Sequence, residues 1–319
     1  MCGPFGVRPR NPSRFGDSRA GDEAPGAAEG PAGNRYDRRM PVDEPVAAAH
    51  WRAELALGYE RRGERTVLAA RRHDGPLVVQ KPFYPEGDAV CHTIVVHPPG
   101  GIAGGDALTL ETAVGGGAHA LLTTPGAAKW YRSAGPWARQ RLAFELAPGA
   151  CLEWLPQESI VFDGARAALE TEIGLAADAR YIGWEIGCLG RSGSGERFTR
   201  GECRLRTRLR IAGRSVWLEQ GCIEAGGRLM RAQAGLAGHS VSGTLIAAGA
   251  PIDDGLLSAC RALAPAAGQG AVTRLPALFV ARYLGDSSEA ARGYFAGVWR
   301  LLRRPMIGRE AVEPRIWRT

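Results

Sequence analysis

From His50 onward, short segments in which apolar and polar residues alternate follow one another along the chain. Alternation with a period of two indicates half-buried β-strands, because successive side chains of a strand point to opposite faces. Gly, Pro or Asp separates the segments, as chain reversals require. The clearest segments cover residues 107–114, 139–146, 168–175, 181–188 and 202–211.

The alternation also predicts which side chains share a face of each strand. The segment 202–211 is the most regular, with four arginines on the face opposite its apolar residues. The predicted apolar faces comprise Leu108, Leu110, Thr112 and Val114; Gln140, Leu142, Phe144 and Leu146; Leu169, Thr171, Ile173 and Leu175; Ile182, Trp184, Ile186 and Cys188; and Cys203, Leu205, Thr207, Leu209 and Ile211.

Helical patterns appear only late in the sequence. Asp253 or Asp254 can cap a short helix that ends before Pro265. Residues 286–289 have capping-box spacing, with Asp286 as the cap, and open a second apolar-faced helix that we expect to stop at Pro305. Strands do not alternate with helices, so a parallel α/β sheet is disfavoured. The sequence predicts a mainly β, many-stranded protein with one or two helices towards the C-terminus.

The N-terminal segment differs in composition from the rest. Residues 1–45 are rich in Pro, Gly and Arg and hold almost no aliphatic side chains, so we expect a disordered extension. Met40 is an alternative start of the chain. Residues 46–319 are expected to form a single β-rich domain, a length sufficient for a full hydrophobic core.

Charge and cysteine content narrow the classes of function. The net charge of +7 suits an acidic partner, but the chain lacks any known nucleic-acid-binding module. Arginine supplies almost all of the positive charge, which also fits GC-rich coding. Its seven cysteines include no C-x-x-C pair, which favours a reducing compartment, the cytoplasm. The chain has no apolar run long enough to cross a membrane, and its N-terminal residues lack an apolar h-region, so we do not expect a secretory signal.

The sequence contains none of the catalytic or phosphate-binding motifs considered below. The Gly-rich residues 100–106 precede a strand instead of the helix that a phosphate-binding loop needs, and no Gly-Lys-Ser/Thr follows. We therefore interpret them as a tight turn in which Asp106 accepts local backbone N–H groups. No G-x-S-x-G, H-x-x-x-H or H-E-x-x-H motif occurs. Cys91, His92, His97 and Cys188 could meet only through the fold, so no closed metal site is predicted.

Two alternatives stay open from the residues alone. Glu158 and Asp163 could serve a carboxylate-based hydrolase, or they could be polar loop residues. The arginine face formed by Arg204, Arg206, Arg208 and Arg210 could bind an acidic protein or a nucleic acid, or it could be a solvated strand face that protects a sheet edge.

An ordered set of motifs connects the chain to a known family. PPGGIAGGD, LLTTPGAAKWYRS, LEWLPQESIVFDGA, GRSGSGERF and the final PRIWRT occur in this order between Trp51 and Thr319. In this arrangement the chain resembles the UreD (UreH) family of urease accessory proteins. It departs from the family at Pro125 and in the long N-terminal extension.

The resemblance implies a β-helix-like scaffold without catalytic activity. Such a scaffold binds UreF, through it the GTPase UreG, and apo-urease, while UreE donates nickel. Nickel would pass through the scaffold transiently and no cofactor would be tightly bound. Candidates to line the nickel passage are Asp106, Glu158, Asp163 and Glu196, and candidates for partner binding are Arg191 and the four residues of the arginine face.

Overall fold

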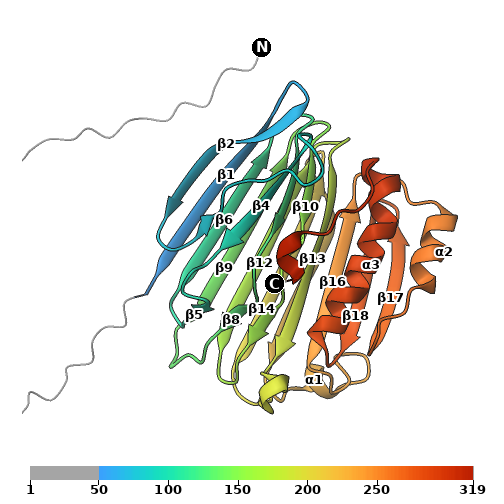
Figure 1. The fold of residues 1–319 in the computed structure, drawn as a ribbon. Helices are drawn as coiled ribbons and strands as arrows, with labels where there is room; N and C mark the ends of the chain where they lie inside the picture. The colour runs from blue at the N-terminus through green and yellow to red at the C-terminus, as the bar shows by residue number, and fades with distance from the viewer. Residues whose placement is uncertain (1–49, 319) are drawn as a thin grey trace, which may run out of the picture. The chain divides into compact units, whose positions relative to one another are not determined.

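Two β-sheets face one another, and the chain visits them alternately (Figure 1). The computed structural model describes residues 50–318, so the predicted extension over residues 1–45 lies outside the described residues. The first sheet consists, in spatial order, of β15 (Arg214–Glu224), β14 (Glu202–Ile211), β12 (Arg166–Leu175), β9 (Ala138–Leu146), β6 (Ala107–Val114), β1 (Arg52–Arg62) and β2 (Arg65–Asp74). The second sheet consists of β17 (Gln269–Leu275), β18 (Leu278–Gly285), β16 (Val241–Ala248), β13 (Arg180–Leu189), β10 (Cys151–Trp154), β7 (His119–Thr123), β4 (Val90–Val96) and β3 (Val78–Val79).

The middle of the chain is a β-solenoid. Each turn holds a strand of the second sheet and then a strand of the first; in three of the turns a short strand lies between them. Strands of successive turns pair in parallel, so that His119 pairs with Val90 and Cys151 pairs with His119. The period is roughly 30 residues, within the range typical of solenoids. The predicted β-helix-like fold is confirmed. The short strands are β5 (Gly101–Ile102), β8 (Ala128–Trp130) and β11 (Ser159–Val161).

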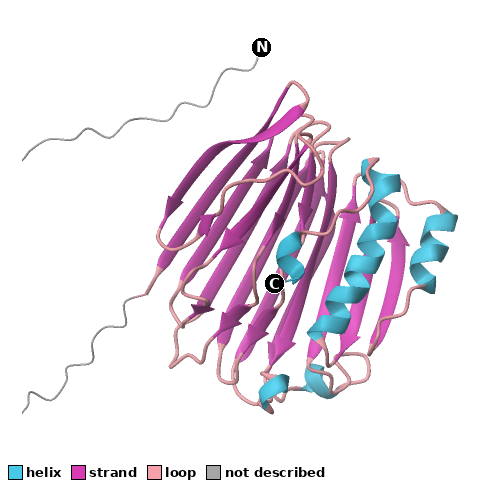
Figure 2. Ribbon diagram, in the orientation of Figure 1, coloured by secondary structure: helices cyan, strands magenta, loops and turns pink. Residues whose placement is uncertain are grey.

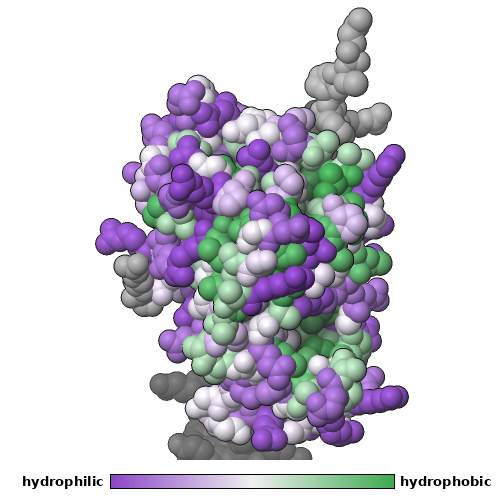
Figure 3. Space-filling view, turned by 90° about the vertical axis from the view of Figure 1, so that its right-hand side faces the viewer, coloured by the Kyte–Doolittle hydropathy of each residue, from purple (hydrophilic) through white to green (hydrophobic). Residues whose placement is uncertain are grey.

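Helices cover the outer face of the later strands of the second sheet (Figure 2). α2 (Asp254–Ala262) and α3 (Ser288–Ile307) pack there, and the remaining helical segments are α1 (Arg228–Arg231), η1 (Ser192–Ser194) and η2 (Arg315–Arg318). Among residues 50–318 no helix has the length and apolar character needed to cross a membrane. The side of the molecule that carries α2 and β17 presents apolar patches among hydrophilic residues (Figure 3).

The ends of α2 and α3 refine the sequence prediction. Asp253 caps α2 by accepting the Leu256 N–H at 2.7 Å, as one of the two predicted caps. The predicted cap of α3 is wrong, because Ser287 accepts the Ala290 N–H while Asp286 accepts the Ser240 N–H instead.

The predicted end of α3 is also wrong. The helix continues through Pro305 to Ile307 and ends at Gly308, which has a φ of 78°. Proline in the last turn removes only one backbone hydrogen bond. Burial of Leu302 and Met306 against the sheet compensates for this loss.

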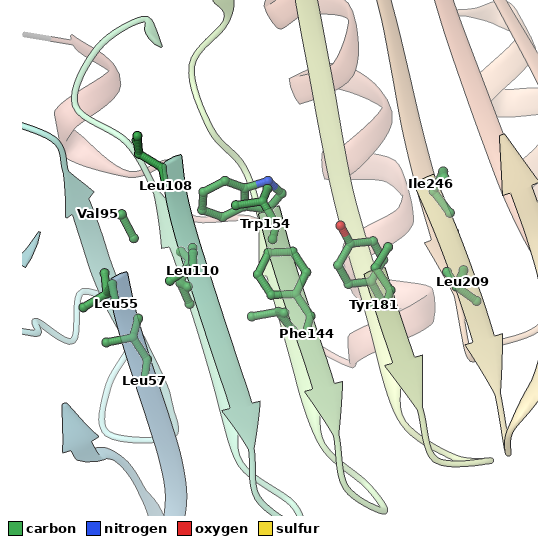
Figure 4. Close-up of a cluster of buried hydrophobic side chains, with 14 of the residues drawn as sticks. Leu55, Leu57, Val95, Leu108, Leu110, Phe144, Trp154, Tyr181, Leu209 and Ile246 are labelled. Carbon is green, nitrogen blue, oxygen red and sulfur yellow. The ribbon is translucent and has the colours of Figure 1, made fainter. Parts of the chain in front are cut away.

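The core between the two sheets includes apolar residues of the predicted faces of β6, β9, β12 and β14. Phe144 from β9 of the first sheet meets Trp154 and Tyr181 from β10 and β13 of the second, together with Leu108 and other aliphatic side chains (Figure 4). The ring centroids of Phe144 lie 5.7 Å from Trp154 and 6.3 Å from Tyr181. Each such side chain contributes about 1.5–3 kcal/mol by leaving water. The face of β13 that carries Trp184 and Ile186 packs instead in a second core beneath α3.

A buried charge cluster fastens α3 to the solenoid. Arg303 is fully buried and pairs with Glu86 at 2.6 Å and with Glu153 at 3.0 Å. Glu153 also accepts the Trp299 indole N–H at 2.6 Å and contacts His119 at 2.7 Å. Burial alone would raise the pKa of Glu153, but His119 and Arg303 outweigh it and hold that pKa at about 2. The cluster therefore keeps its carboxylates charged in the interior.

We predict that Arg303→Leu lowers the free energy of unfolding by about 3–5 kcal/mol, because it leaves two buried carboxylates without their cation. The neighbouring Arg304, whose side chain is 76% exposed, offers a matched control, and Arg304→Leu should change stability by less than about 0.5 kcal/mol. Urea unfolding followed by circular dichroism measures both values. Equal stability of the two variants would contradict the role of Arg303.

We also predict a loss of stability in acid that depends on Glu153. The pKa of Glu153 is about 2 in the folded state, below the ordinary value of 4.5. Its contribution to the free energy of unfolding is therefore full above pH 4.5 and is lost as the pH falls towards 2. Glu153→Gln should be less stable at neutral pH, and its stability should depend less on pH across that window. Urea unfolding at several pH values measures the free energy of unfolding of both proteins. If that free energy falls equally with pH in the wild type and in Glu153→Gln, the assignment is refuted.

Candidate functional site

A cavity of about 860 Å³ lies between the two sheets. Its walls reach from β4 to β18 in the second sheet and from β6 to β15 in the first. Exposed residues line it near both ends of this span, Gly100 and Lys129 beside the early strands and Gln220 and Arg282 beside the late ones. The space therefore extends across several turns of the solenoid.

Two rows of polar side chains face each other towards the late end of the cavity. Thr171, Thr207 and Glu219 are register partners across β12, β14 and β15 of the first sheet. The opposing row is formed by Glu185, Thr244 and Arg282, which are partners across β13, β16 and β18 of the second sheet.

Contacts join these two rows across the interior. The Thr171 hydroxyl donates to Glu185, and Arg282 pairs with Glu219 at 2.6 Å and donates to the Thr244 hydroxyl at 2.6 Å. The polar end of the cavity is thus a defined structure, held by bonds between the two sheets.

Strand alternation explains why polar groups occupy this space. Thr171 lies between the inward residues Leu169 and Ile173, and Thr207 lies between Leu205 and Leu209, so both hydroxyls share the inner face. The same inner-face positions hold Leu110 in β6 and Leu142 in β9. The inner face therefore changes from apolar to polar as the solenoid advances.

The charge of the Glu185 carboxylate is poorly compensated by its neighbours. Burial raises its pKa and the nearby Glu219 raises it further, while the hydrogen bond from Thr171 opposes them. Its remaining accessible surface faces the cavity. Among residues 50–318 no arginine, lysine or histidine forms an ion pair with Glu185. The arrangement can therefore receive a cation from the cavity.

Sequence reasoning missed Glu185. A glutamate between Trp184 and Ile186 resembles the solvent side of a half-buried strand, but β13 is covered by α3 on one face and by the first sheet on the other. The available signal was Tyr181, which is at the same strand parity as Glu185 and indicates that this face is also buried.

Three of the predicted site residues form one network outside the cavity. Asp163 accepts hydrogen bonds from the backbone N–H groups of Thr199 and Arg200 and pairs with the Arg200 guanidinium at 2.7 Å. Glu196 accepts the Asp163 N–H at 3.0 Å and pairs with Arg191 at 2.7 Å. These bonds hold the pKa of Asp163 and of Glu196 below the usual range of carboxyl groups, against the opposing effect of burial. The network ties the loop after β13 to the solenoid.

The other two candidates for the nickel passage, Asp106 and Glu158, lie apart from this network. Asp106 accepts the Ala103 N–H at 2.8 Å and the Trp51 N–H at 2.9 Å, which confirms its predicted role in the turn. Glu158 receives a hydrogen bond from Ser288 at 3.3 Å and lies 3.6 Å from Arg292, so it contacts the start of α3.

The arginine face lies on the outer side of the first sheet and is largely paired with acids. Arg206 contacts Glu170 at 2.8 Å and Arg210 contacts Glu145 at 3.0 Å. Arg204 pairs with Glu202 in its own strand and stacks on Trp137. Such rows of opposite charge favour the interpretation as a solvated strand face.

Metal-ligating side chains are dispersed. Within residues 50–318 no group of three or more His, Cys, Asp or Glu side chains is placed to hold a metal ion. Six cysteines of this part of the chain are free thiols, and all but Cys222 are buried. Burial raises the pKa of Cys203 and of Cys188 to about 12, so both are neutral thiols at ordinary pH.

Comparisons with known proteins agree with one another. A profile described as "UreD urease accessory protein" matches residues 51–318. The chain is 58% identical over 276 residues to the urease accessory protein UreD of Azoarcus sp. (strain BH72), covering 86% of this chain and 96% of that protein. It is 54% identical over 285 residues to the protein of the same name from Dechloromonas aromatica (strain RCB), covering 88% and 99%.

We predict that Glu185→Gln stabilises the fold. The raised pKa of Glu185 means that folding disfavours its charged form. The resulting loss of stability is absent below the pKa of the unfolded state and becomes complete as the pH rises through the pKa of the folded state. A neutral amide can still accept the hydrogen bond of the Thr171 hydroxyl, and the gain should be about 0.5–2 kcal/mol at neutral or alkaline pH, the usual size of a single stabilising substitution. Thermal unfolding measures it. Glu145→Gln on the outer face is the control, and a Glu185→Gln protein less stable than that control would contradict the prediction.

Proposed function

The chain belongs to the UreD family of urease accessory proteins, and on that premise we propose that it is a scaffold through which nickel is inserted into apo-urease. In this proposal it acts with UreF and the GTPase UreG, and UreE donates the metal. Nickel is the cargo of the scaffold. The protein itself performs no catalysis and holds no cofactor.

One observation carries the proposal: the cavity between the sheets contains a carboxylate without a cationic partner among the described residues. A hydrated divalent ion needs about 200 Å³, since each of six waters occupies about 30 Å³. The cavity volume of about 860 Å³ exceeds this requirement. Glu185, Glu219 and the threonine hydroxyls supply oxygen atoms that can replace waters one at a time.

Weak, dispersed ligands suit transfer better than storage. A closed cage of four ligands holds a metal tightly and releases it slowly. No such cage occurs among residues 50–318. We therefore assign the passage to Glu185 and Glu219, which line the cavity, whereas Asp106, Glu158, Asp163 and Glu196 do not.

The partner surfaces follow from exposure. The patches on the side that carries α2 and β17 (Figure 3) are of the kind that docks another protein, and we assign them to UreF. Arg191 and the arginine face remain candidates for contact with acidic surfaces of the complex or of urease. The free cysteines favour the cytoplasm as the compartment of the protein.

The alternatives receive less support. A hydrolase built on Glu158 and Asp163 needs two available carboxyl groups, but both oxygens of Asp163 already accept hydrogen bonds. A nucleic-acid-binding surface on the arginine face needs unpaired cations, whereas Arg206 and Arg210 pair with neighbouring glutamates.

We predict that Thr207→Phe abolishes most urease activation, because its side chain enters the cavity and narrows the passage. The measurement is urease activity and urease-bound nickel in cells that express the urease operon with this variant in place of the wild type. Thr109→Phe is the matched control, since it places the same ring on the outer face of the first sheet.

Co-purification with UreF and UreG and the thermal unfolding temperature show whether the two variants still fold and assemble. The proposed passage is excluded if a folded, assembled Thr207→Phe protein activates urease as well as the wild type does.

A further inference from the structure

His97 is a second polar residue of the cavity whose pairing among the described residues is incomplete. It directly follows β4 and lines the cavity at the end opposite to Arg282 in strand order. Its Nε2 atom is buried and has no hydrogen-bond partner among the described residues. A buried imidazole nitrogen without a partner is costly, and such an exception requires an explanation.

The surrounding turn holds this imidazole in place. The Gly100 N–H donates to the His97 carbonyl at 2.9 Å and closes a reversal, in which Gly100 adopts a φ of 71°. Gly101 packs against the Tyr131 ring, where an added Cβ would lie only 2.0 Å from a ring carbon. The tight glycine turn therefore fixes the backbone that carries His97.

The chemistry of an imidazole differs from that of the late end of the cavity. Burial lowers the pKa of His97, although Asp106 opposes the shift, so the ring is neutral and offers a lone pair. Neutral imidazole suits Ni²⁺, Cu²⁺ and Zn²⁺, whereas carboxylate and hydroxyl oxygens equally suit Mg²⁺ and Ca²⁺. The oxygen atoms around Glu185 therefore cannot distinguish nickel from the abundant magnesium ion.

We propose that His97 is the selectivity-determining residue of the cavity, a transient Nε2 ligand that admits borderline divalent cations such as Ni²⁺ and gives no advantage to Mg²⁺. The inference rests on the proposed passage and assigns selectivity to the end of the cavity that precedes the carboxylates in strand order. One nitrogen ligand with waters in the remaining positions binds weakly enough for the ion to move on. The same contact explains the missing partner of Nε2.

The test uses the full chain and each metal alone. Ni²⁺ and Mg²⁺ binding are measured by calorimetry for the wild type, His97→Gln, Glu185→Gln and a control, His73→Gln, which alters an exposed histidine on β2. X-ray absorption at the nickel edge reports whether an imidazole is bound. We expect His97→Gln to weaken Ni²⁺ binding by at least about 10-fold, since loss of even an outer-shell partner of a metal ligand has an effect of that size. The substitution should also remove the imidazole signal and leave Mg²⁺ binding unchanged. Glu185→Gln should weaken both metals, and His73→Gln neither.

Three outcomes would overturn the inference. These are unchanged Ni²⁺ affinity in His97→Gln, an equal loss for Mg²⁺, or no imidazole signal in the wild type, which would mean that Nε2 binds only a cavity water. Failure here is distinguishable from failure of the passage itself. If the passage exists, Thr207→Phe impairs urease activation at every nickel concentration. His97→Gln should instead raise the nickel concentration that cells need for urease activation in magnesium-rich medium.

Discussion

The space between two parallel-wound sheets must be filled by inward side chains, and the rest of the structure depends on how that constraint is met. Packed sheets lie about 10 Å apart, a distance that bulky side chains bridge. Phe144, Trp154 and Tyr181 bridge it in the middle turns. Further along, Thr207 on β14 takes the inner-face position that Leu142 holds on β9, Thr244 on β16 pairs with Glu185, and the same spacing leaves a cavity. Smaller and polar inner-face side chains thus accompany a chamber within the same two-sheet arrangement.

Much of this fold could be predicted from the sequence, because local rules decide it. The alternation gave the bounds of β6 and β14 as observed, and Asp253 and Asp106 took predicted roles at a helix start and in a turn. The errors arose where tertiary contacts outweighed local ones. Asp286 was drawn away from α3 by Ser240, and α3 continued past Pro305 because its last turn is buried. Glu185 was missed because the covering of both faces of β13 is a tertiary feature, for which Tyr181 on the same face was the one available signal.

The protein buries carboxylates in two contrasting ways. Glu153 is surrounded by a guanidinium, an imidazole and an indole N–H, so its charge is compensated and its pKa is low. Glu185 has a single hydroxyl donor and its pKa is raised. The first arrangement locks elements together, whereas the second leaves unused capacity to bind a cation. A shifted pKa alone would not distinguish a structural carboxylate from a cation-binding one. The direction of the shift and the presence of a cavity do distinguish Glu153 from Glu185.

The span of the Arg303 cluster has a consequence for synthesis on the ribosome. Arg303 and Glu86 are 217 residues apart in the chain, although most of the solenoid pairs each strand with that of the preceding turn. Turns can therefore stack as they emerge, but Glu86 and Glu153 stay without their cation until α3 is translated. A nascent or truncated chain that lacks α3 carries two interior charges that resist burial. Only a chain that includes α3 can therefore bury these charges, and this difference gives cellular quality control a means of recognising unfinished copies.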